Sequence, residues 1–307
     1  MNFVLQNLTE IKGGLSKKKI YRKSEKNINK IYLDFSLDEK EFYNFINIYN
    51  ILKKINISIP KIYEVYKKNK LIIMEDFGDD AFNKVCNEKN LYIFLKVAID
   101  NLIIINNSVT YNDLEKLEKY SFAELKKELG EFVEYYIPHK KISNFQKDKF
   151  YKCWHNSFND HKFIFRSFVH KDFEFINLIL LDKYSNHLRC GIIDFQSALI
   201  GFSGWDLFSI LENPRINFTT KYNDELIKYF FQNVNIETNY ETFLLQYNLL
   251  NLARHTRLLG RWVKLFNSEK NNEYLDFINI IEKRIISNIH KIQSSELKLF
   301  YDKILKN

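Results

Sequence analysis

The feature that most constrains the fold of this chain is a change in its hydrophobic pattern near residue 80. Before that point, "KKKIYRKSEKNINKIYLDFS" alternates weakly around a polar turn, as a β-hairpin does, and "EFYNFINIYNILKKI" carries apolar residues at helical spacing. The stretch "IPKIYEVYKKNKLIIMEDFG" then predicts two strands joined at "KKNK". We therefore expect strands, one helix and further strands, in that order.

From Ala81 onward the pattern is mostly helical. One helical stretch, "SFAELKKELGEFVEYYI", opens with Ser121 and Glu124 at capping-box spacing. Residues 163–196 interrupt the helices with the segments "FIFRSFVH", "NLILLDK" and "RCGIIDF", which are typical of short strands. Helices resume after Trp205. The predicted class is α+β, with a small mixed part before a larger, mainly helical part that carries one β insertion.

The composition is that of a globular protein. A chain of 307 residues with 46% hydrophobic content can bury a core, and only 3 Pro and 8 Gly argue against disorder. The formal charge of +8 would suit an anionic partner, but lysines are scattered, and the tight run Lys17–Lys19 is too short for a nucleic-acid arm. No nucleic-acid partner is therefore expected; salt-sensitive binding of oligonucleotides would support one.

The cysteines and the apolar runs indicate the cellular compartment in which the protein is expected. Cys86, Cys153 and Cys190 are far apart and odd in number, which favours a reducing compartment over a disulfide framework or a CxxC metal site. The N-terminal "MNFVLQNLTEIKGG" lacks a signal-peptide pattern, and apolar runs such as "LIIMEDF" are too short to span a bilayer. We expect a cytoplasmic monomer without a membrane partner.

The polar residues inside the β interruption have the pattern of a phosphoryl-transfer site. In "HKDFEFIN" Asp172 precedes the carboxamide of Asn177, and Asp194 follows in "GIIDFQ". Phosphoryl transfer needs a carboxylate to orient the attacking hydroxyl and oxygen ligands for the Mg²⁺ that neutralises the phosphates. Asp172 suits the first task, and Asn177 and Asp194 suit the second. The alternative is that these are ordinary turn and strand-end residues, and their mutual spacing argues against it.

These segments resemble a known superfamily. "HKDFEFIN" followed by "IIDF" is similar to the H-R-D-x-x-x-x-N and D-F-G segments of protein-kinase-like proteins, in the relaxed form of the aminoglycoside phosphotransferase and choline kinase branch. With "MEDFGDDAF", "GFSGWDLFSIL" and "ARHTRLLGRWVKL" in order, the chain most resembles bacterial cell-wall amino-sugar kinases that act on the anomeric hydroxyl. The resemblance implies a two-lobed fold, with a small mixed β-sheet lobe over residues 1–78 and a mainly helical lobe over 79–307.

The resemblance also implies a site for ATP. "IKGGLSKKK" lies where the superfamily has its phosphate-covering hairpin, so Gly13, Gly14 and Ser16 are candidates to meet phosphate, with Lys17–Lys19 adding charge. Bare Gly-Gly is more often an ordinary turn. "LIIMEDFG" is similar to the hinge, where backbone groups near Glu75 and Phe77 would meet the base, and this stretch does not separate ATP from GTP.

One expected residue is missing from its usual place. The strand "KIYLDF" has no lysine at the position that normally pairs with the α- and β-phosphates. Lys30 is the candidate at its start, and Lys19 or Arg22 are alternatives. Because this lysine is absent, a nucleotide-binding regulator without phosphotransfer remains an alternative to an enzyme.

Two further features narrow the acceptor. Asp206 in "GWDL" looks like the superfamily's helix-start Asp, and the short segment 195–205 leaves no room for an activation segment, so a small-molecule acceptor is favoured over a protein. Arg254, Arg257 and Arg261 share one helical face, which could bind an acidic amino sugar or, as we favour, brace the fold. His170 is interpreted as a buried brace of the loop rather than a base.

Overall fold

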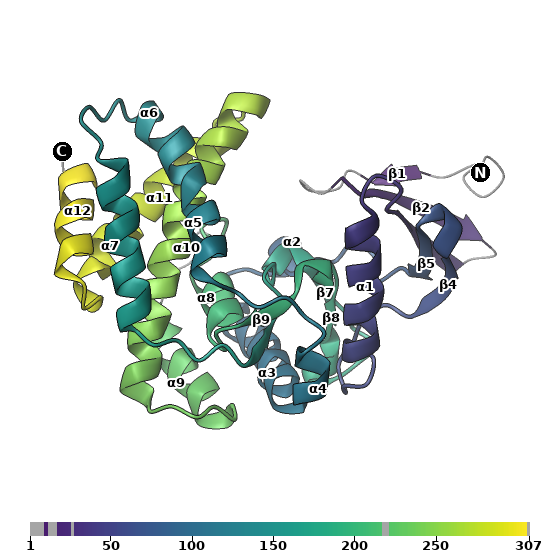
Figure 1. Cartoon of the computed structure of the whole chain (residues 1–307). Helices are drawn as coiled ribbons and strands as arrows, with labels where there is room; N and C mark the ends of the chain where they lie inside the picture. The colour runs from purple at the N-terminus through teal and green to yellow at the C-terminus, as the bar shows by residue number, and fades with distance from the viewer. Residues whose placement is uncertain (1–8, 12–16, 26–27, 217–220, 306–307) are drawn as a thin grey trace. The chain divides into compact units, whose positions relative to one another are not determined.

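The computed structural model describes residues 9–11, 17–25, 28–216 and 221–305. Gly13, Gly14 and Ser16 lie outside the described residues, so their predicted role stays a prediction. The chain forms two compact units (Figure 1). Unit 1 comprises Met1–Leu117, His170–Leu199 and Tyr222–Val234, and unit 2 comprises Glu118–Val169, Ile200–Lys221 and Asn235–Asn307. The lobe boundary that we predict after residue 78 stays a prediction.

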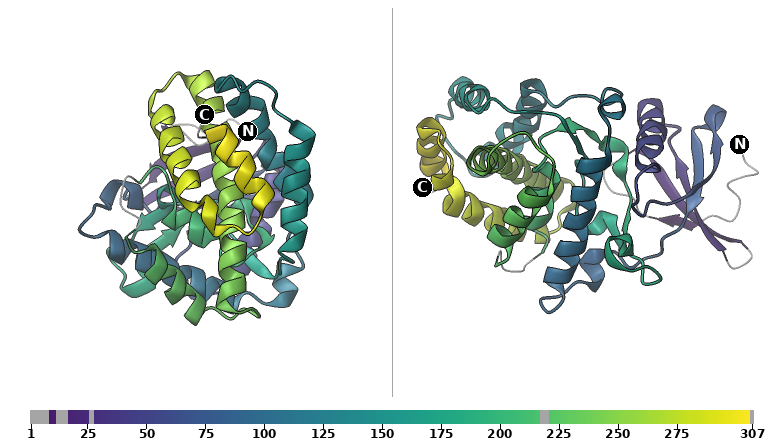
Figure 2. Two further views of the ribbon diagram at one scale, coloured as in Figure 1. Left: turned by 90° about the vertical axis from the view of Figure 1, so that its left-hand side faces the viewer. Right: turned by 90° about the horizontal axis from the view of Figure 1, so that it is seen from below.

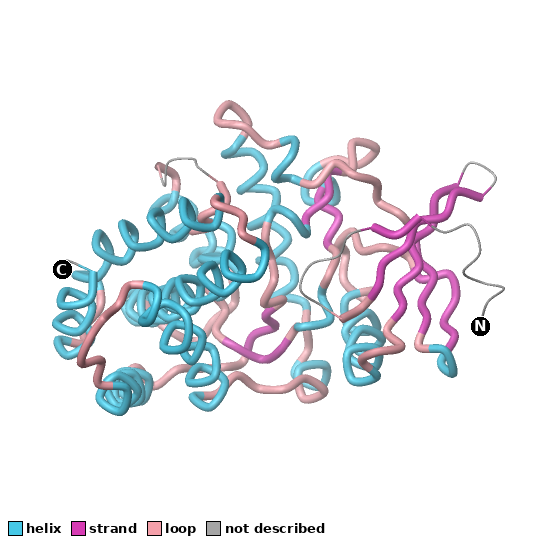
Figure 3. The backbone as a smooth tube through the Cα atoms, turned by 90° about the horizontal axis from the view of Figure 1, so that it is seen from above, coloured by secondary structure: helices cyan, strands magenta, loops and turns pink. Residues whose placement is uncertain are grey.

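The N-terminal part of unit 1 is an antiparallel five-stranded sheet, drawn in magenta in Figure 3. The strand order is β1-β2-β3-β5-β4. The strands are β1 (Thr9–Ile11), β2 (Lys19–Glu25), β3 (Ile28–Asp34), β4 (Ile62–Tyr66) and β5 (Leu71–Glu75), and helix α1 (Glu39–Leu52) falls between β3 and β4. The predicted order of hairpin, helix and strand pair is confirmed.

The side chains of this sheet alternate between its two faces. Ile31 pairs with Met74, and Leu33 pairs with Ile72, so these side chains point to one face; Tyr32 and Ile73 point to the other. Phe35 continues the alternation of Leu33, because its backbone N–H still donates to Lys70 across the pair.

Helix α1 covers the face to which Phe35 points. The ring of Phe35 lies 6.1 Å from that of Phe42 and 5.6 Å from that of Phe45, both on α1. The helix begins where the Asp38 side chain accepts a hydrogen bond from the Glu41 N–H. The opposite face, with Tyr32, faces away from α1.

The rest of unit 1 contains a short hairpin. Strand β7 (Leu178–Leu180) pairs with β8 (Cys190–Ile192), and each strand is bridged to an earlier segment, Ile179 to Ala81 and Gly191 to Ser58. The helices of this part are α2 (Phe82–Val85), α3 (Leu91–Ser108), α4 (Tyr111–Leu114) and α9 (Asn223–Asn233).

Helix α3 is longer than apolar runs such as "LIIMEDF". Among the described residues it is the one helix that is long and apolar enough to cross a membrane by length and composition, a test that core helices of soluble proteins also pass. Its charged residues Lys96 and Asp100 pair with each other at 2.7 Å, and Tyr229 of α9 donates a hydrogen bond to Asp100 at 2.8 Å. A side-chain hydrogen bond thus connects α3 to α9.

Unit 2 is mainly helical and is built around one long helix, α10 (Tyr240–Glu269), which packs against α11 (Figure 2). Ser121 caps α5 as predicted, since its side chain accepts from the Glu124 N–H. The other elements are α5 (Phe122–Glu131), a π-helical turn (Phe132–Tyr136), α6 (Ile137–His139), α7 (Lys147–Asp160), β6 (Ser167–Val169), β9 (Leu199–Gly201), α8 (Trp205–Leu211), α11 (Glu273–Asn288) and α12 (Ser295–Leu305).

Candidate active site

The loop from His170 to Asn177 is held by bonds within itself. The backbone oxygen of Asp172 accepts a hydrogen bond from the Glu174 N–H at 2.9 Å, and the Glu174 oxygen accepts from the Asn177 N–H at 2.8 Å. The rings of Phe173 and Phe175 are 0% and 1% exposed, so they anchor the loop in the core. The polar residues of the loop, Asp172, Glu174 and Asn177, are partly accessible to solvent.

Asn177 ties the loop to the strand that leads to Asp194. Its amide nitrogen donates to the backbone oxygen of Asp172 at 2.9 Å, and its own backbone oxygen accepts from the Ile193 N–H at 3.1 Å. Because the amide nitrogen is used in this way, the amide oxygen is the atom available to ligate a cation. Asp172, Asn177 and Asp194, which were predicted to act together, are thus connected by direct hydrogen bonds and one peptide link.

Asp194 has an unusual backbone conformation and a cationic neighbour. Its φ of 65° is left-handed, a region that aspartate tolerates better than most residues. The Nζ of Lys18 forms an ion pair with its Oδ1, and the Gln196 amide donates to the same oxygen at 3.1 Å. Burial works to raise the pKa of Asp194, but the Lys18 charge and these hydrogen bonds hold the pKa below its ordinary value.

His170 begins the loop, and its side chain contacts the segment that leads to Asp194. Its side chain is buried, and its Nε2 hydrogen-bonds the backbone oxygen of Ile193 at 3.2 Å. Burial lowers the pKa of His170 to about 4, against the opposing effect of the Asp194 charge. The neutral ring therefore donates to Ile193, which supports the interpretation of His170 as a brace.

The basic residues of the sheet go to different places. Lys30 on β3 lies opposite Glu75 on β5 in the strand register. Its side chain is half-buried, and its Nζ lies 5.7 Å from the centre of the Tyr63 ring. Arg22 pairs with Asp76 at 2.6 Å and with Asp79 at 2.8 Å. The basic residue that pairs with Asp194 is instead Lys18, which precedes β2 and belongs to the run Lys17–Lys19.

The predicted hinge residues lie at the end of β5. The Glu75 N–H donates to the Lys61 oxygen at 2.8 Å, so it is engaged within the sheet. Phe77 packs with Ala81, Ile179 and Leu181. Its ring is so close to Gly191 that a Cβ at that position would lie 2.6 Å from it. This close approach fixes the segment that contains Phe77 against the β7–β8 hairpin.

The donor set fits magnesium better than a transition metal. No group of three or more His, Cys, Asp or Glu side chains that could hold a metal occurs among the described residues. Asn177 and Asp194 offer an amide and a carboxylate oxygen, and Mg²⁺ is commonly bound through one or two such groups plus phosphate oxygens and water. The residues present therefore fit a Mg²⁺ that arrives with a polyphosphate.

The arginine face of α10, in unit 2, is engaged by the protein itself. Arg261 donates to Glu131 at 2.8 Å, and Arg257 lies 3.6 Å from Glu128, both carboxylates on α5. Arg254 donates to the backbone oxygen of Ser209 at 3.4 Å. These contacts support the bracing interpretation over the binding of an acidic substrate.

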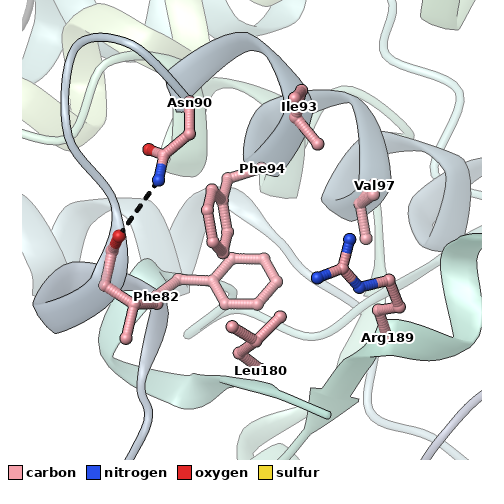
Figure 4. Close-up of a pocket in the computed structure, with 8 residues that line it drawn as sticks. Phe82, Asn90, Ile93, Phe94, Val97, Leu180 and Arg189 are labelled. Carbon is pink, nitrogen blue, oxygen red and sulfur yellow. Dashed lines mark hydrogen bonds between the residues drawn. The ribbon is translucent and has the colours of Figure 1, made fainter. Parts of the chain in front are cut away.

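A cavity of about 300 Å³ lies elsewhere in unit 1 (Figure 4). Its lining is largely apolar and comes from α2, α3, β7 and Arg189. Asn90 closes one side by donating to the Val85 oxygen at 3.2 Å. Of the predicted site residues that the structure describes, none lines this cavity.

Two curated proteins resemble the chain in sequence. The N-acetylmuramate/N-acetylglucosamine kinase of Caulobacter vibrioides is 26% identical over 72% of this chain and 63% of its own length. The protein of the same name from Pseudomonas aeruginosa is 20% identical over 80% of this chain and 72% of its own length. The match thus spans less than two thirds of the first relative. No protein-family model matches the chain.

Solved structures share the fold. The choline kinase LicA from Streptococcus pneumoniae has a TM-score of 0.60 with 15% identity, covering 92% of this chain and 95% of that one. The ADP-bound aminoglycoside phosphotransferase APH(2'')-Ib has a TM-score of 0.56 with 13% identity, covering 89% and 91%. The predicted α+β, protein-kinase-like fold and the predicted resemblance to this branch are confirmed.

Proposed function

We propose that this chain is an ATP- and Mg²⁺-dependent phosphotransferase that phosphorylates a hydroxyl of a small metabolite. The observation that carries the proposal is the bonded connection from Asp172 through Asn177 to Asp194, in a chain with the fold of nucleotide-bound phosphotransferases. A transition state of phosphoryl transfer is stabilised mainly by positioning and charge neutralisation, so these few residues are sufficient.

Each residue has a defined task in this proposal. Asp172 orients the acceptor hydroxyl, and the Asn177 amide oxygen and the Asp194 carboxylate hold the cation. Mg²⁺, when bound, neutralises the phosphate charge. The loop with Gly13, Gly14 and Ser16 covers the phosphates, and backbone groups near Glu75 and Phe77 receive the base. His170 fixes the strand that carries Asp194 by its bond to Ile193.

The favoured acceptor is an amino sugar. Both curated relatives are named kinases of N-acetylmuramate and N-acetylglucosamine, which supports an acetylated amino sugar as the first compound to try. A cytoplasmic location would supply ATP and Mg²⁺, and the free thiols of Cys86, Cys153 and Cys190 are compatible with it.

The second candidate is a nucleotide-binding regulator without phosphotransfer. It is favoured by one observation, the position of Lys30 beside Tyr63 and opposite Glu75 rather than next to Asp194. In such a protein nucleotide would bind, but no acceptor would stimulate its turnover.

An acceptor panel separates the two candidates. The purified chain is incubated with Mg-ATP and, separately, N-acetylmuramate, N-acetylglucosamine, an aminoglycoside, choline and homoserine, and ADP release is followed. ADP release that depends on one acceptor, with the phosphorylated product seen by mass spectrometry, is expected. Nucleotide binding without turnover on any acceptor would favour the regulator, and absence of both would refute both candidates.

A further inference from the structure

Lys18 differs from its neighbours in the lysine run. Lys17 and Lys19 are exposed, whereas only 5% of the Lys18 side chain is exposed and its Nζ contacts Oδ1 of Asp194. Lysine is among the residues least often buried, and a buried ammonium is normally paired. Burial against Asp194 therefore distinguishes Lys18 from Lys17 and Lys19.

Strand alternation explains why Lys18 and not Lys19 reaches Asp194. Ile20 pairs with Leu33 and Lys19 pairs with Asp34, so Lys18, two residues before Ile20, belongs to the face that α1 covers. Lys30 lies three residues before Leu33 on β3, an odd number, so its side chain belongs to the opposite face.

Packing brings Asp194 to the same helix independently of charge. Phe195, the next residue, stacks on Phe45 of α1 with ring centres 4.7 Å apart. Phe45 also contacts Phe35, which extends the sheet face of Ile20. The ammonium and the carboxylate are thus held at one place by elements distant in the sequence.

The ion pair and a metal ion would compete for one carboxylate. Displacing Lys18 from Asp194 breaks a largely buried ion pair, which opposes a metal ion that arrives alone. A polyphosphate that arrives with the metal offers the ammonium new anionic oxygens and thereby compensates for the loss.

We infer that Lys18 holds Asp194 in the nucleotide-free protein and moves to the nucleotide phosphates when Mg²⁺ binds, so that metal and nucleotide bind cooperatively. This rests on the proposed function, because it takes Asp194 as a metal ligand. Lys18, rather than Lys30, then supplies the cation to the phosphates, and the missing strand lysine does not imply a missing activity.

Binding measurements on matched variants test this inference. Mn²⁺, as a probe for Mg²⁺, is titrated without nucleotide and followed by electron paramagnetic resonance; a non-hydrolysable ATP analogue is titrated with Mg²⁺ by calorimetry. In Lys18→Met, Mn²⁺ should bind about 5-fold tighter or more without nucleotide. The analogue should bind roughly 10-fold more weakly or worse. Lys89→Met removes an exposed lysine outside the candidate site and is the control, which should behave as the wild type. Lys30→Met tests the competing phosphate partner and should also bind the analogue as the wild type does.

The outcomes separate failure of this inference from failure of the proposed function. A wild type that binds the analogue with Mg²⁺, beside a Lys18→Met protein with unchanged or weaker Mn²⁺ binding, overturns the inference alone. Loss of analogue binding in Lys30→Met would do the same. A wild type that binds no nucleotide overturns the proposed function and this inference with it. Lys18→Gln, with the same expected changes, replaces Lys18→Met if that protein does not fold.

Discussion

The side-chain nitrogen of Asn177 donates to the backbone oxygen of Asp172 at 2.9 Å, while the backbone oxygen of Asn177 accepts from Ile193 at 3.1 Å. One residue therefore fixes the loop that carries Asp172 to the strand that leads to Asp194. In the proposed phosphotransferase, Asn177 has a positioning role in addition to its role as a ligand.

Removing the Asn177 amide should reduce turnover more than folding stability. In Asn177→Ala, the loop loses its bond to Asp172 and the cation loses a ligand, so we expect kcat to fall about 100-fold or more. Acceptor-dependent ADP release measures the effect, and thermal unfolding checks the fold. Asn106→Ala removes a similar amide-to-backbone bond of 2.9 Å in α3 and should leave kcat unchanged. Equal losses in the two variants would contradict the role.

Asp172→Asn tests the orienting carboxylate. The amide keeps the size of the side chain but removes the negative charge that orients the acceptor hydroxyl, so kcat should fall about 100- to 10,000-fold. Nucleotide affinity with Mg²⁺, measured by calorimetry, should change little because Asp172 is not assigned to the metal. A variant with near-normal kcat refutes the assignment.

Asp194→Ala should remove the dependence of nucleotide binding on Mg²⁺. The variant lacks the one charged oxygen ligand that we assign to the cation, and Lys18 loses its ion-pair partner. We expect the ATP analogue to bind with the same affinity with and without Mg²⁺, as measured by calorimetry. A preserved effect of Mg²⁺ would show that the metal is held elsewhere.

The parts of the site that could be predicted from the sequence are local. Asp172 and Asn177 lie in one loop, and the order of strands and helices follows from hydrophobic periodicity, which is a property of short segments. Ser121 caps α5 for the same reason, because the signal lies within a few residues.

The pairing of Lys18 with Asp194 depends on information that short segments do not contain. It requires the register of β2 on β3, which decides the face of each lysine, and the contact of Phe195 with α1. The sequence signal for this pairing is that Lys18 lies two residues before apolar Ile20, which puts both side chains on one face of the strand. Strand β1 was missed because it is a short edge strand whose residues are mostly exposed, so it lacks an apolar pattern.

An acid-sensitive cluster in unit 1 provides a test of the structure apart from activity. Asp113, whose side chain is 8% exposed, accepts from Lys54 at 2.8 Å and Lys116 at 3.0 Å. These bonds, with one from Thr110, lower the pKa of Asp113 to about 2. In the unfolded chain the pKa of Asp113 is near 3.9, so its carboxylate binds a proton more readily there than in the folded protein. The stabilisation is therefore present above about pH 4 and is lost as the pH falls towards 2.

Urea unfolding of the wild type and Asp113→Asn measures this contribution. Because both lysines are half exposed, we expect a difference of only about 1 kcal/mol at pH 7, less than the pKa shift alone would give. The difference should shrink as the pH is lowered from 5 to 2.5. A difference that is constant over this range would contradict the ion-paired state of Asp113.

Two helical glycines of unit 2 should respond in opposite directions to alanine. A Cβ on Gly260 in α10 would lie 2.2 Å from the backbone of Glu131, whereas a Cβ on Gly130 in α5 would meet nothing closer than the Tyr151 hydroxyl at 3.9 Å. Gly260→Ala must push α10 away from α5, and we expect it to lose about 1–3 kcal/mol of stability in spite of the better helix propensity of alanine. Gly130→Ala gains the propensity without a clash and should be more stable by about 0.5–1 kcal/mol. Urea unfolding of the two variants beside the wild type gives both values, and a Gly260→Ala protein as stable as Gly130→Ala would refute the close contact between the two helices.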